Sequence, residues 1–223
     1  MIFAYEVDIQ NDFMNKANGR LYVEGAEEIK PEIAKLVDML EESGTRRIRS
    51  RDRHFKEDLE LEINGGPFPF HCMDKSYNQI NQNGMYGVDF IPELKTRSEL
   101  RIENRAYTKS EIKDFVRSLK DLVLEKQHYD VFTNPNSNAV FEEMLTDGFN
   151  EAIVYGVATN VCVLAAVKGL QQRGIKTYVV NNAIAGVPDE YAPTSNTDAI
   201  SIMKESGAKF VESQYIAKLI KGN

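Results

Sequence analysis

The sequence predicts a single α/β domain over residues 1–223, with a doubly wound, mostly parallel sheet in a three-layer α/β/α arrangement. Short apolar runs rich in β-branched residues alternate with longer segments whose apolar residues recur at helical spacing. A chain of 223 residues is also long enough to bury one large core. Repeated strand–helix units favour a parallel sheet, because the helix provides the crossover between two parallel strands.

The first part of the chain predicts two strands with a helix between them. Residues 2–9 and 45–51 are short strand-like runs. Residues 25–43 are predicted to be helical, and Gly44 ends the helix. The apolar positions of this helix recur every three or four residues, at Ile29, Ile33, Leu36, Val37 and Leu40.

A long irregular stretch follows over residues 52–92. It contains two adjacent glycines, several prolines and asparagines, and two of the three histidines. A loop of this length inside a compact domain is usually functional. We therefore expect it to contribute to a binding or catalytic site.

The rest of the chain returns to alternating elements. Helices are predicted at 110–118 (with Ser110 as the N-cap), 137–145, 161–173 and 194–206. Strands are predicted at 122–127, 151–157, 176–183 and 209–211. No repeat, low-complexity segment or linker divides the chain.

The composition is typical of a globular protein, with 42% hydrophobic and 27% charged residues. A net charge of −7 argues against nucleic acid as a partner. The one cluster of arginines, within residues 46–51, is interpreted as a solvated or edge strand. No apolar stretch approaches the length of a membrane span, and the first residues lack signal-peptide features, so we expect no membrane association and a cytoplasmic location.

Cys162 lies in the first turn of a predicted helix, just beyond a predicted strand. The N–H groups and dipole of a helix N-terminus lower the pKa of a thiol, and the thiolate is the nucleophilic form. A free cysteine can equally be a small, inert core residue. Position alone leaves both alternatives open. A disulfide with Cys72 is not expected in a reducing compartment.

Chemically complementary side chains follow several predicted strands. Asp8 lies at the end of the strand at 2–9, Asp52 and His54 follow the strand at 45–51, Lys126 lies at the end of the strand at 122–127, and Cys162 follows the strand at 151–157. In parallel α/β sheets, sites form outside the carboxyl ends of the strands. We therefore expect these side chains to share one edge of the sheet, although strands also end at polar residues by chance.

Five segments resemble the cysteine hydrolase superfamily of isochorismatase and nicotinamidase. They are residues 7–13 (VDIQNDF), 51–54 (RDRH), 69–72 (PFHC), 125–132 (EKQHYDVF) and 155–162 (YGVATNVC). They occur in the expected order over essentially the whole chain, and the last is the most specific. The resemblance implies an isochorismatase-like, Rossmann-like fold.

By this resemblance, Asp8, Lys126 and Cys162 form a catalytic triad. A carboxylate can accept the thiol proton, and an ammonium stabilises the thiolate. The resemblance also implies a cis peptide bond between Val157 and Ala158, and an oxyanion hole formed by the N–H groups of Ala158 and Cys162. Taken singly, Asp8 could be a turn residue and Lys126 a solvent-exposed charge.

Asp52, His54 and His71 form a candidate site for one divalent metal ion. One carboxylate and two imidazoles with open positions suit zinc, iron or manganese, and we expect zinc. The nicotinamidase branch has the same ligand set, with Glu60, Glu62 or water left as candidates to complete it. The metal would orient the substrate by its pyridine nitrogen. The alternative is an Asp–His pair that only holds the loop.

Aromatic side chains near these motifs could enclose a flat ring. We expect Phe13, Phe68 and Phe132 to do so, with Tyr129 as an alternative to Phe132. Each is also an ordinary core residue type. His128 is interpreted as a structural residue or part of the pocket rim.

The resemblance implies a nicotinamidase that converts nicotinamide and water to nicotinate and ammonia through a thioester on Cys162. It also implies a role in NAD salvage and assembly as a homo-oligomer. Residues 73–84 depart from the Gly-Thr-x-Gly-like turn usual in that branch, and we expect this loop to help cover the pocket. The first alternative is a metal-free amidase of the superfamily acting on a carbamoyl or ureido compound. The second is a catalytically idle binding subunit, and a vinyl-ether hydrolase is the least favoured.

Overall fold

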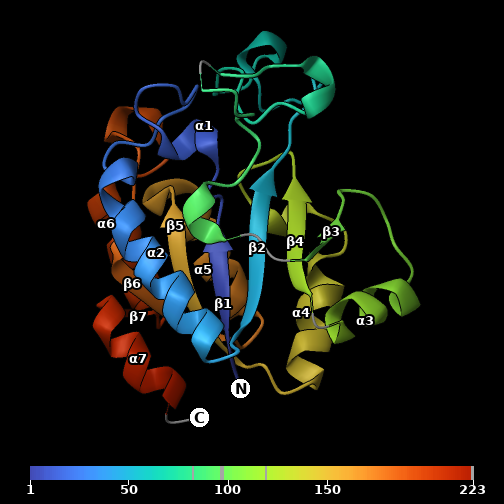
Figure 1. Cartoon of the computed structure of the whole chain (residues 1–223), viewed down its shortest axis with the longest axis vertical. Coiled ribbons are helices and arrows are strands. Elements are labelled where there is room, and N and C mark those ends of the chain that lie inside the picture. Colours follow the sequence, from blue (N-terminus) through green and yellow to red (C-terminus); the bar gives the residue numbers. More distant parts are fainter. Residues whose placement is uncertain (82, 96–97, 119, 222–223) are drawn as a thin grey trace.

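The central strand of the sheet is β1 (Ile2–Val7), and the seven strands formed by the described residues lie in the order β3–β4–β2–β1–β5–β6–β7 (Figure 1). All pairings are parallel, which confirms the predicted sheet. The structure, a computed structural model, describes residues 1–81, 83–95, 98–118 and 120–221. The other strands are β2 (Arg46–Asp52), β3 (Glu99–Ile102), β4 (Asp121–Lys126), β5 (Glu151–Val157), β6 (Lys176–Ala185) and β7 (Lys209–Val211).

Helices cover both faces of this sheet, as predicted. On one face, α2 (Ala26–Glu42) packs beside α7 (Ser213–Lys221) (Figure 1). The opposite face carries α3 (Lys109–Arg117), α4 (Ser137–Thr146), α5 (Leu164–Gln172) and α6 (Asn196–Glu205). A short buried helix, α1 (Asn11–Met14), follows β1. Among the described residues, no helix is long and apolar enough to cross a membrane.

Several elements differ from the prediction. The N-cap of α3 is Thr108, which forms a capping box with Glu111, so the choice of Ser110 was wrong. The predicted helix at 161–173 begins instead with a π-helical turn, Thr159–Val163, before α5. The strand β3 and the helices α1 and α7 were not predicted, because each is short or lies at an edge of the fold.

The arginine-rich strand β2 is an interior strand between β1 and β4, so its interpretation as a solvated or edge strand was wrong. Arg47 and Arg49 are completely buried. Glu6 of β1 pairs with both, at 2.7 Å from Oε1 to Nε of Arg47, and also accepts a hydrogen bond from the Tyr155 hydroxyl at 2.6 Å. Arg49 also donates to Asp121 at 3.0 Å. The arginines are tolerated inside because carboxylates surround them.

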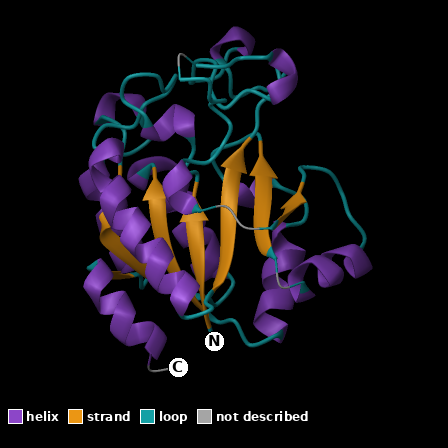
Figure 2. Cartoon of the chain, in the orientation of Figure 1, coloured by secondary structure: helices purple, strands orange, loops and turns teal. Residues whose placement is uncertain are grey.

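The connection from β2 to β3 rises above the carboxyl ends of the strands (Figures 1 and 2). As predicted, it is mostly irregular, although Asp52 still belongs to β2. In its described part, which omits residues 82, 96 and 97, the regular elements are three short 3-10 turns, Glu62–Asn64, Lys75–Tyr77 and Pro92–Leu94. Single bridges pair His54 with Met73 and Leu61 with Phe68, which folds the connection back on itself.

Candidate active site

Four adjacent strands, β4, β2, β1 and β5, end in the four side chains expected at the sheet edge. Lys126 and Asp52 are the last residues of β4 and β2, Asp8 follows β1, and Cys162 follows β5. All four are buried, with exposed fractions of 8% or less. The order of these strands therefore brings Asp8 and Cys162, which are 154 positions apart in the sequence, to the same lysine side chain.

Lys126 connects the other three side chains. Its Nζ lies 2.9 Å from Asp8 Oδ2 and 3.9 Å from Cys162 Sγ, and it donates a hydrogen bond to Asp52 Oδ1. Burial opposes the charged form of this lysine, but Asp52 and Asp8 outweigh it and raise the pKa of Lys126 well above its usual value. The lysine is therefore an ammonium that is shared by two carboxylates and a sulfur.

Asp8 has a backbone conformation that few residues other than glycine adopt, and its side chain is held by contacts with its neighbours. Its φ of 48° is in the left-handed region, which turns the chain sharply away from β1. Ser50 of β2 donates a hydrogen bond to Oδ1 at 2.7 Å, whereas Oδ2 accepts none among the described residues and faces Lys126 as an ion pair. Burial raises the pKa of Asp8, and the opposing charge of Lys126 does not cancel this effect. Oδ2 is thus an oxygen that can take up a proton.

Cys162 lies within the π-helical turn that joins β5 to α5, and both cysteines of the chain are free. The pKa of its thiol is raised by burial, with Lys126 opposing. The expected lowering by a helix N-terminus was therefore wrong, because loss of water around the sulfur outweighs the favourable charges. A thiol in this state needs a base before it can act as a nucleophile.

The peptide bond between Val157 and Ala158 is cis, as the family resemblance implied. Ala158 lies at the start of the turn that carries Cys162, and both residues line the same small cavity. The next carbonyl, that of Ala158, accepts hydrogen bonds from the N–H groups of Val161 and Val163. The oxyanion hole of Ala158 and Cys162 stays a prediction.

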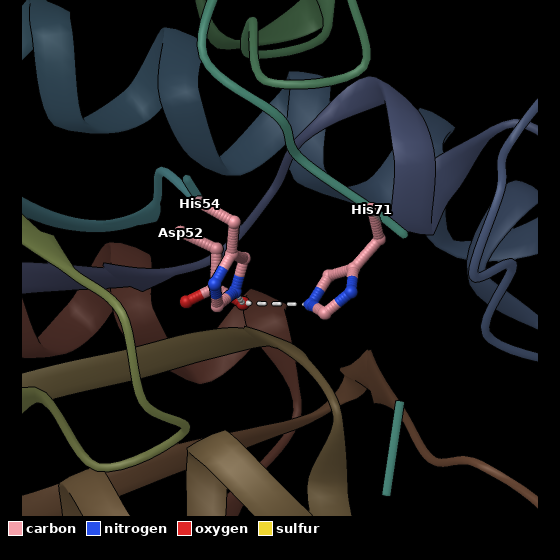
Figure 3. Close-up of side chains that lie close together, drawn as sticks. All are labelled: Asp52, His54 and His71. Carbon is pink, nitrogen blue, oxygen red and sulfur yellow. Dashed lines mark ion pairs between the residues drawn. The ribbon is translucent and has the colours of Figure 1, made fainter. Parts of the chain in front are cut away.

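Asp52, His54 and His71 form a compact cluster whose ligand atoms all lie within 4.8 Å of one another (Figure 3). Asp52 Oδ2 lies 3.9 Å from Nε2 of His54 and 3.7 Å from Nε2 of His71. The other oxygen of Asp52 accepts the hydrogen bond from Lys126. Burial opposes ionisation of Asp52, but Lys126 and the two histidines outweigh it and lower the pKa of this carboxyl.

The surroundings of the two histidines fit a metal ion. Nδ1 of His54 is hydrogen-bonded with Asp58 at 3.1 Å, and Nδ1 of His71 with the Pro69 carbonyl at 2.7 Å. Nε2 of His54 is buried with no hydrogen-bond partner among the described residues. Metal-binding histidines are typically oriented in this way through their second nitrogen. The set Asp52, His54 and His71 can therefore hold zinc, iron or manganese.

Of the two glutamates considered for this cluster, Glu60 lies close to it and Glu62 is exposed. Glu60 Oε2 is 3.7 Å from Nε2 of His54, and Oε1 accepts a hydrogen bond from the Tyr129 N–H at 2.8 Å. Burial, followed by the charge of Asp52, raises the pKa of Glu60 to about 7. Glu60 therefore contacts both His54 and the segment that follows β4.

A small cavity of about 30 Å³ joins the two clusters. Its lining includes Cys162 and Ala158 on one side and Asp52 and His71 on the other. Phe13 and Phe68 also line it, with ring centroids 5.5 and 5.9 Å from the His71 ring. The cavity thus places aromatic walls beside both the thiol and the histidine cluster.

Phe132 does not take the position that we expected. Its ring packs against Phe141 at a centroid distance of 5.4 Å, and the Arg173 guanidinium lies 3.7 Å from its centroid. Gly169 leaves room for it, because a Cβ there would lie 1.9 Å from the ring. The Phe132 prediction was therefore wrong, and Tyr129, the alternative, lines the cavity instead.

A wider vestibule of about 1480 Å³ lies outside the small cavity and shares lining residues with it, among them Phe68, Tyr129 and Val187. His128 lies in the vestibule wall with its ring 4.1 Å from that of Tyr129, in agreement with the predicted rim position. None of the described residues of the 73–84 loop lines either space. Gln79 of the loop nevertheless accepts a hydrogen bond from Arg20, which lines the vestibule, so the expectation that this loop helps to cover the pocket stays a prediction. Residue 82 lies outside the described part.

Two residues of the site were not singled out by the sequence. Ser50 could have been found, because the two-residue period of a strand places it on the same face as Asp52. Asn160 gave no such signal. Its side chain bonds both backbone groups of Val187, accepting from the N–H at 3.1 Å and donating to the carbonyl at 3.0 Å. It joins the turn of Cys162 to the vestibule wall, a pairing that only the fold creates.

The parallel sheet and the strand-end site together define an isochorismatase-like hydrolase. The chain belongs to the isochorismatase family, since the family model of the isochorismatase domain matches residues 6–214. No curated protein sequence matches the chain.

Solved structures with the same fold cover almost the whole chain. The zinc complex of the Pyrococcus horikoshii pyrazinamidase has a TM-score of 0.67 and 22% identity, over 95% of this chain and 98% of its own. N-carbamoylsarcosine amidase from Thermoplasma acidophilum gives 0.65 and 23%, over 95% and 96%. Nicotinamidase/pyrazinamidase from Bacillus subtilis gives 0.67 and 20%, over 95% and 99%. At these identities the similarity establishes the fold.

Proposed function

We propose that the protein is an amidohydrolase that converts nicotinamide to nicotinate and ammonia through a thioester on Cys162. The observation that carries this proposal is the position of the Lys126 ammonium, 2.9 Å from Asp8 and 3.9 Å from the Cys162 sulfur, beside a cavity that the histidine cluster also lines. A carboxylate, an ammonium and a thiol in contact are the groups that covalent amide hydrolysis needs.

The first half of the proposed reaction breaks the carbon–nitrogen bond. Asp8 accepts the proton of the Cys162 thiol, and the sulfur forms a bond to the amide carbon while Lys126 stabilises the negative charge near it. The N–H groups of Ala158 and Cys162 stabilise the oxyanion of the tetrahedral intermediate. Asp8 then returns the proton to the leaving nitrogen, so that ammonia departs and a thioester remains.

The second half releases the acid. Asp8, again a carboxylate, takes a proton from a water molecule, and the oxygen of that water attacks the thioester carbon. The carbon–sulfur bond breaks, and the sulfur leaves with the proton that Asp8 holds. One amide and one water are thus converted to one acid and one ammonia, and Cys162 and Asp8 return to their starting protonation states.

Asp52, His54 and His71 would hold a divalent metal ion, for which we propose zinc, and Glu60 is near enough to be a further ligand. When bound, such an ion supplies a Lewis acid that takes the pyridine nitrogen of the substrate. The chain's own contribution is the aromatic wall of Phe13, Phe68 and Tyr129, which would orient the ring and keep water away from it.

An ammonia-release assay tests this proposal, together with elemental analysis of the purified protein. The panel is nicotinamide, pyrazinamide, N-carbamoylsarcosine and a simple ureido acid, with Cys162→Ala as the control. We expect turnover of nicotinamide and about one equivalent of metal. Metal-independent turnover of the carbamoyl or ureido compounds alone would favour the other amidase class. No turnover of any amide would favour a binding subunit.

A further inference from the structure

We propose that Gln10 is a positioning residue that fixes Asp52 for its two contacts, the Lys126 ammonium and the metal ion. This inference rests on the proposed metal site. It starts from the way in which the first strand leaves the sheet. The register of β1 and β2 pairs Glu6 with Arg49, and the chain then turns away at Asp8, where φ is positive.

Beyond that turn, the side chain of Gln10 takes the place of the missing strand. Its Oε1 accepts a hydrogen bond from the Asp52 N–H at 2.8 Å, and its Nε2 donates to the Asp52 carbonyl, also at 2.8 Å. This pair of hydrogen bonds, one to the N–H and one to the carbonyl of the same residue, is the kind that a residue of a neighbouring β-strand would provide. Gln10 is fully buried, so water cannot replace these bonds without a rearrangement.

A third bond attaches the same amide to the long connection. Nε2 of Gln10 also donates to the Val88 carbonyl at 3.0 Å, and the Gln10 backbone forms an antiparallel bridge with Phe90. Both amide hydrogens are therefore in use. The end of β1, the end of β2 and residues 88–90 meet at one side chain.

The backbone of Asp52 needs this support because its carboxylate serves two partners in different directions. Oδ1 accepts from Lys126, and Oδ2 faces Nε2 of both His54 and His71. Asp52 is the last residue of β2, where pairing with β1 has already ended. Rotation of its peptide units would move both oxygens, so the Gln10 amide sets the geometry of the two clusters together.

The length and chemistry of the side chain are both required. Glutamate has the same shape but has no N–H, and it would direct a carboxylate at two carbonyl oxygens. Asparagine keeps the amide but is one methylene shorter. Methionine has a similar length with no hydrogen-bonding group, so Gln10→Met removes the bonds while filling the space.

The test measures zinc affinity by competition with a chelator, in the absence of any amide. We expect Gln10→Met to weaken zinc binding by roughly 10- to 100-fold, and Gln10→Asn to behave similarly if Gln10→Met does not fold. The matched control is Asn182→Leu. Asn182 also pairs with a backbone N–H, that of Ser213 at 3.0 Å, but lies away from the pocket lining. Asp52→Ala should abolish binding.

Unchanged zinc affinity in a folded Gln10 variant would overturn the inference, as would an equal loss in Asn182→Leu, which would indicate a purely structural role. A wild-type protein that binds no zinc would overturn it too. Failure to hydrolyse nicotinamide leaves this test intact, because no substrate is present. The Co²⁺-substituted protein gives a second readout. Its visible spectrum should change in the Gln10 variant and stay unchanged in the Asn182 variant.

Discussion

The charged atoms of Asp8 and Lys126 lie 2.9 Å apart although their strands, β1 and β4, are separated in the sheet by β2. The contact is possible because the long lysine side chain reaches across the end of β2 and also bonds to Asp52 there. One ammonium thereby holds together the acid, the thiol and the histidine cluster.

Replacing Cys162 by alanine should reduce ammonia release to background, because no other thiol lines the small cavity. The fold and the metal content should stay as in the wild type, measured by circular dichroism and elemental analysis. Turnover at more than about 1% of the wild-type rate would rule out the thioester route.

Asp8→Asn and Lys126→Met should each lower kcat by roughly 10²- to 10⁴-fold, since one removes the proton acceptor and the other the charge beside the sulfur. Single-turnover measurements of thioester formation would check that acylation is the affected step. The control is Arg173→Met, which removes a cation that packs on Phe132 outside the cavity. This variant should keep the wild-type kcat. A wild-type rate in either variant would contradict its proposed role.

His54→Ala should lower the metal content from about one equivalent to near zero and raise KM for nicotinamide roughly 10- to 100-fold. The reason is that His54 supplies a buried nitrogen with no hydrogen-bond partner among the described residues. Elemental analysis and steady-state kinetics provide the measurement. Retained metal would show that other residues form the ligand set.

Glu6→Gln should lower the free energy of unfolding by about 3–5 kcal/mol, because it removes the buried carboxylate that Arg47 and Arg49 share. Urea denaturation measures the difference. The matched control is Asp38→Asn, which removes an exposed ion pair with Lys95 and should cause no measurable loss. Equal effects of the two changes would contradict the importance of the buried network.

The same residue predicts how stability depends on pH. Burial opposes ionisation of Glu6, but Arg49 and Arg47 outweigh it and hold its pKa below the usual 4.5. A lowered native pKa contributes stability that is fully present above the unfolded value of 4.5 and is lost as the pH falls through the native value. The stability difference between wild type and Glu6→Gln should therefore be constant above about pH 5.5 and shrink below pH 4.5. A difference that grows on acidification would contradict this.

The sequence predicted the parts of the fold that depend on local pattern. Alternating apolar runs predicted six of the strands, and the rule that sites follow parallel strands brought Asp8, Asp52, Lys126 and Cys162 to one edge. The triad and the metal ligands were predicted from the motifs that carry the family resemblance.

What the sequence did not predict depends on partners distant in the chain. Arg47 and Arg49 appeared to be surface residues because the sequence does not show that Glu6 and Asp121 come to face them. The pKa of Cys162 was expected to fall because of its position at a helix N-terminus, but burial raises it. That burial depends on residues from several elements, which the sequence alone does not bring together. Phe132 lies close to Lys126 in sequence, but its ring turns toward Phe141.

Part of the proposed pocket has a different origin from the side chains that we propose to react. Asp8, Lys126 and Cys162 are attached to ends of sheet strands, whereas Phe68 and His71 come from the long connection after β2. If the proposed function holds, insertions or substitutions in that connection should alter which amide is accepted without displacing the proposed nucleophile, Cys162, or its proposed base, Asp8. Directed evolution toward a new amide should begin in residues 55–70, with the strand ends kept unchanged.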